Sequence, residues 1–198
     1  MNDLKGTGMS GRRNIAKRFL PATALAVLAG GALLRPSPAA AATRADIDRD
    51  VQAAQARLRS MDNARPLFGL ARAILIFPRI ISGGFIIGGQ YGEGALVQDG
   101  AIRGYYNIAG VSLGLLAGAQ SAGLAMFFMS DEAIAALMRA DGWEIGTGPS
   151  VVVLDRGVQA NVTATTLREP VYAITFGQEG LMAALALNGT KISRITPD

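Results

Sequence analysis

The chain has 198 residues with no cysteine and no histidine, which excludes disulfides, thiolate chemistry and any catalysis or metal binding by imidazole. Half of the residues are apolar and 17% are charged, a composition typical of a globular or membrane-associated protein. The net charge of +4 belongs to the N-terminus, because residues 43–198 hold 13 basic and 14 acidic residues, so we expect no nucleic-acid partner. We also expect no cofactor and no metal.

The first 42 residues have the layout of a secretory signal peptide. A basic segment that contains Arg12-Arg13, the start of a pattern resembling a twin-arginine signal, precedes the apolar run Phe19–Leu34 and a small-residue stretch ending at Ala42. We predict cleavage near Ala42, a periplasmic or secreted location, and one domain over residues 43–198. A retained membrane anchor is the alternative, but a spanning helix needs about 20 apolar residues, more than this run supplies.

Residues 43–64 are predicted to form an amphipathic helix. Apolar residues recur at steps of four and three, which places one side of the helix on a core. These residues are Ile47, Val51, Ala54, Leu58 and Met61. Pro66 is expected to end the helix. The alternative is a helix that lies on a membrane surface, but the apolar side lacks Trp and Phe, so packing on the core is favoured.

After this helix the hydrophobic period changes to two. Ala73–Phe77 is predicted to be a buried strand that Pro78 stops, and Ser82–Val97 a second strand that leads to a hairpin turn at Asp99-Gly100. Glycines alternate within this region, which indicates bends, bulges or close backbone approach. They do not form a phosphate loop, because no Gly-Lys-Ser/Thr follows. The predicted structural glycines are Gly84, Gly88, Gly89, Gly92 and Gly94.

The remaining elements are predicted to be strands around one short helix. A strand over Ile108–Gln120 is followed by a turn at Ser121-Ala122-Gly123 and a strand over Leu124–Met129. Ser130 caps a helix that Gly142 stops. Later strands are expected at 150–154, 161–166, 171–176 and 181–187, before a tail that frays from Ile195. The expected fold class is α+β: a curved, mainly antiparallel sheet or small barrel with an N-terminal helix and one central helix.

The acidic residues do not point to an enzyme. Glu93 is the only charge in its glycine-rich strand, but a glycosidase needs two carboxylates about 5–9.5 Å apart, and the sequence marks out no such pair. A solvent-facing or salt-bridged Glu93 is the simpler interpretation. We predict no catalytic residue; an enzymatic function would require turnover that is lost in Glu93→Gln.

Arginines are concentrated at the start of the predicted domain. Seven lie between Arg44 and Arg79, where they would form a patch for anionic head groups, because the guanidinium fork matches phosphate. Four aspartates in the same stretch dilute the patch, so a solvated mixed-charge surface is the alternative. The predicted lipid-contacting residues are Arg57, Arg59, Arg65, Arg72 and Arg79.

The pattern from Ala73 to Gly100 resembles the SYLF domain family in its strand Ala73-Ile-Leu-Ile-Phe-Pro and in the glycine spacing of Gly83–Val97. The resemblance continues through Val111–Gln120, with its Gly-Ala-Gln step, and Ala125–Met129. It also includes the helix from Asp131 and the closing hairpin around Gly177-Gln-Glu-Gly-Leu, and so covers most of residues 45–195.

This resemblance implies a lipid-binding module rather than an enzyme. Eukaryotic members bind phosphoinositides, some bind and bundle actin, and bacterial members are typically exported. Phosphoinositide binding in the family depends on a basic, amphipathic N-terminal segment, which corresponds here to the region of Arg57, Arg59 and Arg65 but without lysine. An exported protein would not meet actin, so the expected partner is phospholipid or a membrane surface. The alternative is a structural or protein-interaction module of the envelope, whose protein partner the sequence does not specify.

Overall fold

The computed structural model describes residues 42–139, 142–154, 168–179, 187 and 189–198, with backbone only at 85–87, 112–119 and 179. The predicted signal peptide, apart from residue 42, lies outside the described residues, as do the strand predicted at 161–166 and nearly all of that at 181–187. The elements are α1 (Arg44–Arg59), α2 (Arg65–Phe68), β1 (Ala73–Gln98), β2 (Ala101–Phe128), α3 (Asp131–Leu137), β3 (Trp143–Glu144), β4 (Val151–Val153), β5 (Val171–Glu179) and β6 (Lys191–Ile195).

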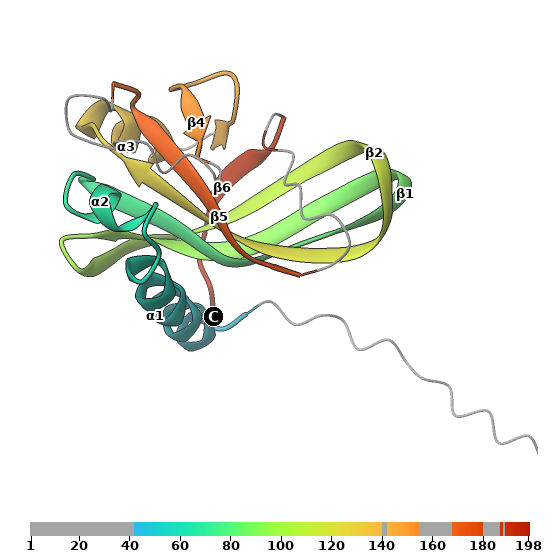
Figure 1. Cartoon of the computed structure of the whole chain (residues 1–198), viewed down its shortest axis with the longest axis horizontal. Helices are drawn as coiled ribbons and strands as arrows, with labels where there is room; N and C mark the ends of the chain where they lie inside the picture. Colours follow the sequence, from blue (N-terminus) through green and yellow to red (C-terminus); the bar gives the residue numbers. More distant parts are fainter. Residues whose placement is uncertain (1–41, 140–141, 155–167, 180–186, 188) are drawn as a thin grey trace, which may run out of the picture. The chain divides into compact units, whose positions relative to one another are not determined.

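The fold is α+β, with a curled and mostly antiparallel sheet, an N-terminal helix and a short central helix, as the sequence predicts (Figure 1). In the described residues the sheet has six strands in the order β3-β6-β2-β5-β4, and β1 pairs with β2 along the opposite edge. The long β2 strand is therefore central, and its second edge is shared between β6 and β5. Of the strand pairs that the structure describes, β4–β5 is the parallel one.

One very long hairpin, β1–β2, dominates the sheet. Asp99 (φ 53°) and Gly100 (φ 74°) form a two-residue turn, so the predicted hairpin turn is confirmed. The prediction that Pro78 stops the first strand is wrong, because a register shift between Phe77 and Ile80 accommodates the proline as a bulge inside β1. The turn predicted at Ser121-Ala122-Gly123 is also wrong, because β2 runs through these residues to Phe128.

The hairpin is too long to remain straight. A strand of 26 residues would extend about 85 Å, whereas a domain of about 160 residues has a radius of gyration of about 15 Å. The strands therefore curl, and the two halves of β1 cross at close range. At Gly94 an added Cβ would overlap the Ile76 carbonyl oxygen, and at Gly92 it would lie 2.7 Å from the Arg79 carbonyl oxygen. Side chains at these two positions would hold the crossing backbones apart.

The other predicted structural glycines lie in the β1–β2 ladder without such a crossing. Gly84 is opposite Gly118, and Gly88 is opposite Ser112. At Gly89 an added Cβ would lie 3.9 Å from the Gly110 carbonyl oxygen, which is an ordinary contact. The space around Gly89 therefore does not require glycine.

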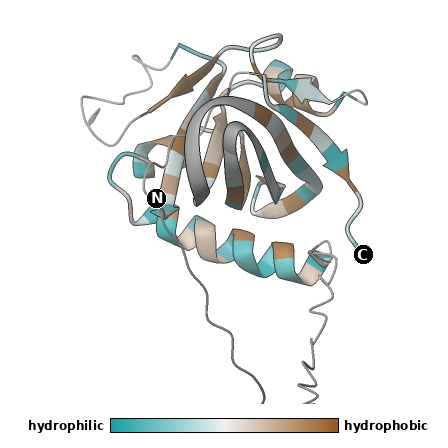
Figure 2. Cartoon of the chain, turned by 90° about the vertical axis from the view of Figure 1, so that its right-hand side faces the viewer, coloured by the Kyte–Doolittle hydropathy of each residue, from teal (hydrophilic) through white to brown (hydrophobic). Residues whose placement is uncertain are grey.

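The curled sheet buries apolar residues on both faces. On β1, Leu75 and Phe77 belong to one buried cluster, while Ile74 and Ile76 belong to the cluster beneath α1. Figure 2 shows α1 lying across one side of the sheet. The side of α1 that the sequence predicts to be apolar is the buried one, through Ile47, Val51, Ala54 and Leu58.

The ends of the helices and of the chain differ from the predictions. The first helix ends at Arg59 with Ser60 as its C-cap, and Pro66 lies instead in the first turn of α2. Ser130 caps α3 as predicted, accepting a hydrogen bond from the Ala133 N–H at 3.2 Å, although α3 ends at Leu137, before Gly142. The tail is anchored rather than frayed, because the Asp198 main-chain oxygen accepts a hydrogen bond from the Arg44 N–H at 2.9 Å. Among the described residues, no helix has the length and apolar character needed to cross a membrane.

Candidate functional site

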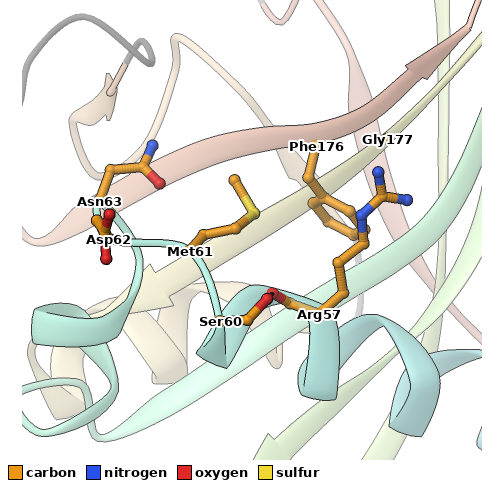
Figure 3. Close-up of a pocket in the computed structure, with 7 residues that line it drawn as sticks. All are labelled: Arg57, Ser60, Met61, Asp62, Asn63, Phe176 and Gly177. Atoms are coloured by element: carbon orange, nitrogen blue, oxygen red, sulfur yellow. Dashed lines mark hydrogen bonds between the residues drawn. The ribbon is translucent and has the colours of Figure 1, made fainter.

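Two adjoining hollows flank the Arg57 side chain at the end of α1. One, of about 340 Å³, lies between the α1–α2 connection and β5, and the other, of about 220 Å³, lies between β1, β2 and β5. Both are lined by Arg57, Phe176 and Gly177, so we call them together the Arg57 cleft. Figure 3 shows the Arg57 guanidinium beside Phe176 and Gly177, with Met61 pointing toward Phe176 from the other side.

A bulge in β5 shapes the floor of the Arg57 cleft. Between the pairs Ser121–Glu179 and Gly123–Phe176 the register shifts by one residue, and Gly177 has a φ of 58°. An added Cβ at Gly177 would lie 3.0 Å from Nη1 of Arg57, in a backbone conformation that side chains rarely adopt. The glycine therefore allows the guanidinium to lie directly against the β5 backbone.

Hydrogen-bond donors predominate in the Arg57 cleft. Arg57 lines both hollows and Arg79 lines the smaller one, and neither has an ion pair with any residue that the structure describes. The Asn63 side-chain nitrogen is buried and has no hydrogen-bond partner among the described residues. The acid in the lining, Asp62, is 3.3 Å from Arg65 in an ion pair. This donor set suits a ligand that brings oxygen acceptors and negative charge.

The structure does not bring all five predicted arginines into the Arg57 cleft. Arg59 lies with its guanidinium carbon 4.5 Å from the centre of the Phe68 ring, a cation–π contact. Arg65 pairs with Asp62, and Arg72 pairs with Asp131 at 3.0 Å beside α3. Both ion pairs are exposed to solvent, where such pairs are worth at most about 1 kcal/mol. Only Arg57 and Arg79 of the five line the cleft.

A second arginine cluster, not predicted from the sequence, lies at the other end of α1. Arg44, Arg103 and Arg194 line a pocket of about 360 Å³ at the beginning of α1. These residues come from α1, β2 and β6, and no sequence motif joins them. Arg103 and Arg194 lie outside the elements predicted from the sequence, and a basic residue there does not differ from a solvated surface residue.

Glu93 is engaged in structural contacts. Its carboxylate accepts a hydrogen bond from the Tyr91 hydroxyl at 2.6 Å and another from the Ala42 backbone N–H at 3.2 Å. Burial and the Glu93 hydrogen bond raise the pKa of Tyr91. Among the described residues there is no group of three or more acidic side chains that would hold a metal ion.

The curled sheet, the helix α1 across it and the donor-lined cleft are the features against which known proteins can be compared. Residues 109–196 match the family model described as Ysc84: Las17-binding protein actin regulator. This segment is therefore similar to that family, whose description names protein binding and actin regulation. The match covers somewhat less than half of the chain and leaves out α1, α2 and β1, so Arg57 and Arg79 lie outside it. No curated protein matches the chain.

Proposed function

We propose that this chain is an exported, non-enzymatic protein that binds anionic phospholipid, with the Arg57 cleft as its contact site. The observation that carries the proposal is that Arg57 and Arg79 line the same cleft and that neither forms an ion pair with any described residue. A phosphate group would supply acceptors for both guanidinium groups.

Apolar surface beside the cleft supports the same proposal. Phe176 and Ala122 line the cleft but are almost completely buried, so the exposed apolar side chain is Ile81, two residues after Arg79, which is 53% exposed. Basic and apolar groups side by side suit the interface of a bilayer, where phosphates lie above acyl chains.

Export is supported by the basic, apolar and small-residue layout of residues 1–42. The intact mass of the exported protein tests this, and we expect the mass of a chain that begins near Thr43.

Co-sedimentation with vesicles tests the membrane contact. The compact unit Ala39–Asp198 is mixed with phosphatidylcholine vesicles, with or without phosphatidylglycerol, at low and high salt. We expect binding only to the anionic vesicles and weaker binding at high salt, because salt screens exposed charges. The double variant Arg57→Gln/Arg79→Gln should bind about 30-fold more weakly, since each arginine near an anionic surface contributes about 1 kcal/mol.

The matched control is Arg139→Gln/Arg168→Gln, which removes the same charge from exposed positions outside the Arg57 cleft. An equal loss in both double variants would show general charge attraction and would contradict a specific cleft.

The family description names a protein that binds another protein, so a protein-interaction module is the second candidate function. Absence of vesicle binding in the unaltered chain would favour that candidate.

A further inference from the structure

The pocket lined by Arg44, Arg103 and Arg194 lies at the opposite end of α1 from the Arg57 cleft. Its volume of about 360 Å³ falls within the range of small-ligand sites. The rest of its wall consists of Ile102, Gly104, Tyr105, Ile195, Thr196 and Pro197. We call it the three-arginine pocket.

A bulge in β2 positions one of the three arginines. Leu96 pairs with Gly104 and Val97 pairs with Ile102, so Arg103 is the extra residue between two regular pairs. Bulges of this kind redirect a side chain out of the regular alternation and are frequent beside functional sites. Gly104 next to it lies close to Arg194, because an added Cβ there would be 3.6 Å from Nε and Nη2 of Arg194, an ordinary contact.

The first residue of α1 is held in place by contacts of its side chain and its backbone. The Arg44 guanidinium carbon is 5.5 Å from the centre of the Tyr105 ring, and the Tyr105 hydroxyl donates a hydrogen bond to Asp48 at 2.8 Å. The hydrogen bond from the Arg44 N–H to Asp198 ties the tail to the helix, so Thr196 and Pro197 form a wall of the pocket. The arginine is thus oriented before any ligand arrives.

The three arginines of the pocket have little ion pairing with the residues that the structure describes. Arg194 has no ion pair with a described residue, and Arg103 has only a 3.8 Å pair with Asp99, whose side chain is 79% exposed. An exposed pair of this kind is worth at most about 1 kcal/mol. The acids nearby are Asp48, which accepts the Tyr105 hydrogen bond, Asp99 and Asp198, and none of them lines the pocket.

We propose that the three-arginine pocket binds a phosphate group with three terminal oxygens, either a phosphomonoester or a pyrophosphate. Three guanidinium groups from separate elements match three charged oxygens, whereas a phosphodiester offers two non-bridging oxygens and a single charge. The proposal does not rest on membrane binding by the Arg57 cleft, since it concerns a separate site and includes soluble phosphates.

Isothermal titration of the full chain with inorganic pyrophosphate tests the site. We expect saturable binding that weakens about tenfold in Arg194→Gln, because a charged hydrogen-bond donor is lost. The control Arg139→Gln removes the same charge outside the pocket and should bind within about twofold of the unaltered chain. Thermal unfolding of each variant shows that it remains folded, and Arg103→Gln provides a second variant if Arg194→Gln unfolds.

Vesicles distinguish the two sources of the phosphate group. A preference for phosphatidic acid over phosphatidylglycerol vesicles that is lost in Arg194→Gln would identify a lipid headgroup. Pyrophosphate binding without that preference would identify a soluble phosphate. Undetectable pyrophosphate binding at millimolar concentration, or equal binding by the unaltered chain and Arg194→Gln, would overturn the proposal. The variant Arg57→Gln/Arg79→Gln should bind pyrophosphate as tightly as the unaltered chain, so the proposals for the two sites are tested independently.

Discussion

At the scale of single residues, Tyr106 combines full burial with an unpartnered polar atom. The side chain is 1% exposed, and its hydroxyl has no hydrogen-bond partner among the described residues. Burial raises the pKa of Tyr106, and the positive charge of Arg194 partly offsets this effect. The ring stabilises the core, while the hydroxyl lowers the stability that the ring provides.

Replacing Tyr106 with phenylalanine is therefore expected to stabilise the protein by about 1 kcal/mol at pH 7, as urea unfolding would measure. A raised folded-state pKa leaves the stability of the unaltered chain intact below the unfolded pKa of about 10 and removes it as pH rises further. The variant should lose less stability above pH 10, although the pKa values of Tyr91 and Tyr105 are also raised. A variant less stable than the unaltered chain would show that the hydroxyl has a partner.

At the scale of elements, the start of α1 is fixed by a reciprocal contact in its first turn. The Thr43 hydroxyl accepts a hydrogen bond from the Asp46 N–H at 3.2 Å and donates one to the Asp46 carboxylate at 2.7 Å. This hydroxyl is the main cause of the lowered pKa of Asp46. The helix thus begins one residue after the position where we predict that the chain is cleaved.

Thr43→Ala is expected to destabilise the protein by about 1 kcal/mol in urea unfolding at pH 7, because it removes the N-cap. A lowered folded-state pKa contributes stability above the unfolded value of about 4 and loses it as pH falls through the folded pKa. The difference between Thr43→Ala and the unaltered chain should therefore shrink in acid. The control Thr43→Ser keeps the hydroxyl, and an equal loss in that variant would contradict the capping argument.

Elements that depend on local pattern could be predicted from the sequence, and those that depend on distant contacts could not. The buried side of α1 and the Ser130 cap follow from side-chain spacing and local hydrogen bonds. Pro78 has the same local signal whether it ends a strand or lies in a bulge, and only pairing with β2 decides between them. Likewise, pairing of β2 with β6 brings Arg103 and Arg194 to one pocket across about 90 residues of sequence.

At the scale of the whole domain, the crossing of β1 over itself sets how closely the two halves of the sheet approach. The crossing depends on Gly94 having no side chain, because the Ile76 backbone occupies the position that a Cβ would take. Rigid backbone cannot yield as a flexible side chain does. A single methyl group at this position would therefore alter packing in both halves of the curl.

Gly94→Ala is expected to destabilise the protein by about 3 kcal/mol, because it overpacks the crossing. Urea unfolding measures this loss, and Gly89→Ala is the matched control in the same strand, where an added Cβ meets only an ordinary contact. The control should change stability by less than about 1 kcal/mol. Equal losses in both variants would indicate a general effect of glycine on strand curvature instead of a specific crossing.

The two-residue turn at Asp99-Gly100 has a consequence for the order of folding events. Residues on either side of the turn pair with partners only a few positions away, so the hairpin grows from there at low entropic cost. The contact of Gly94 with Ile76, by contrast, closes a loop within β1 itself, and β5 and β6 add to β2 from more distant sequence. We therefore expect pairing that starts at the turn to place the glycines of the crossing in register before the hairpin bends, so that the bend forms late in folding.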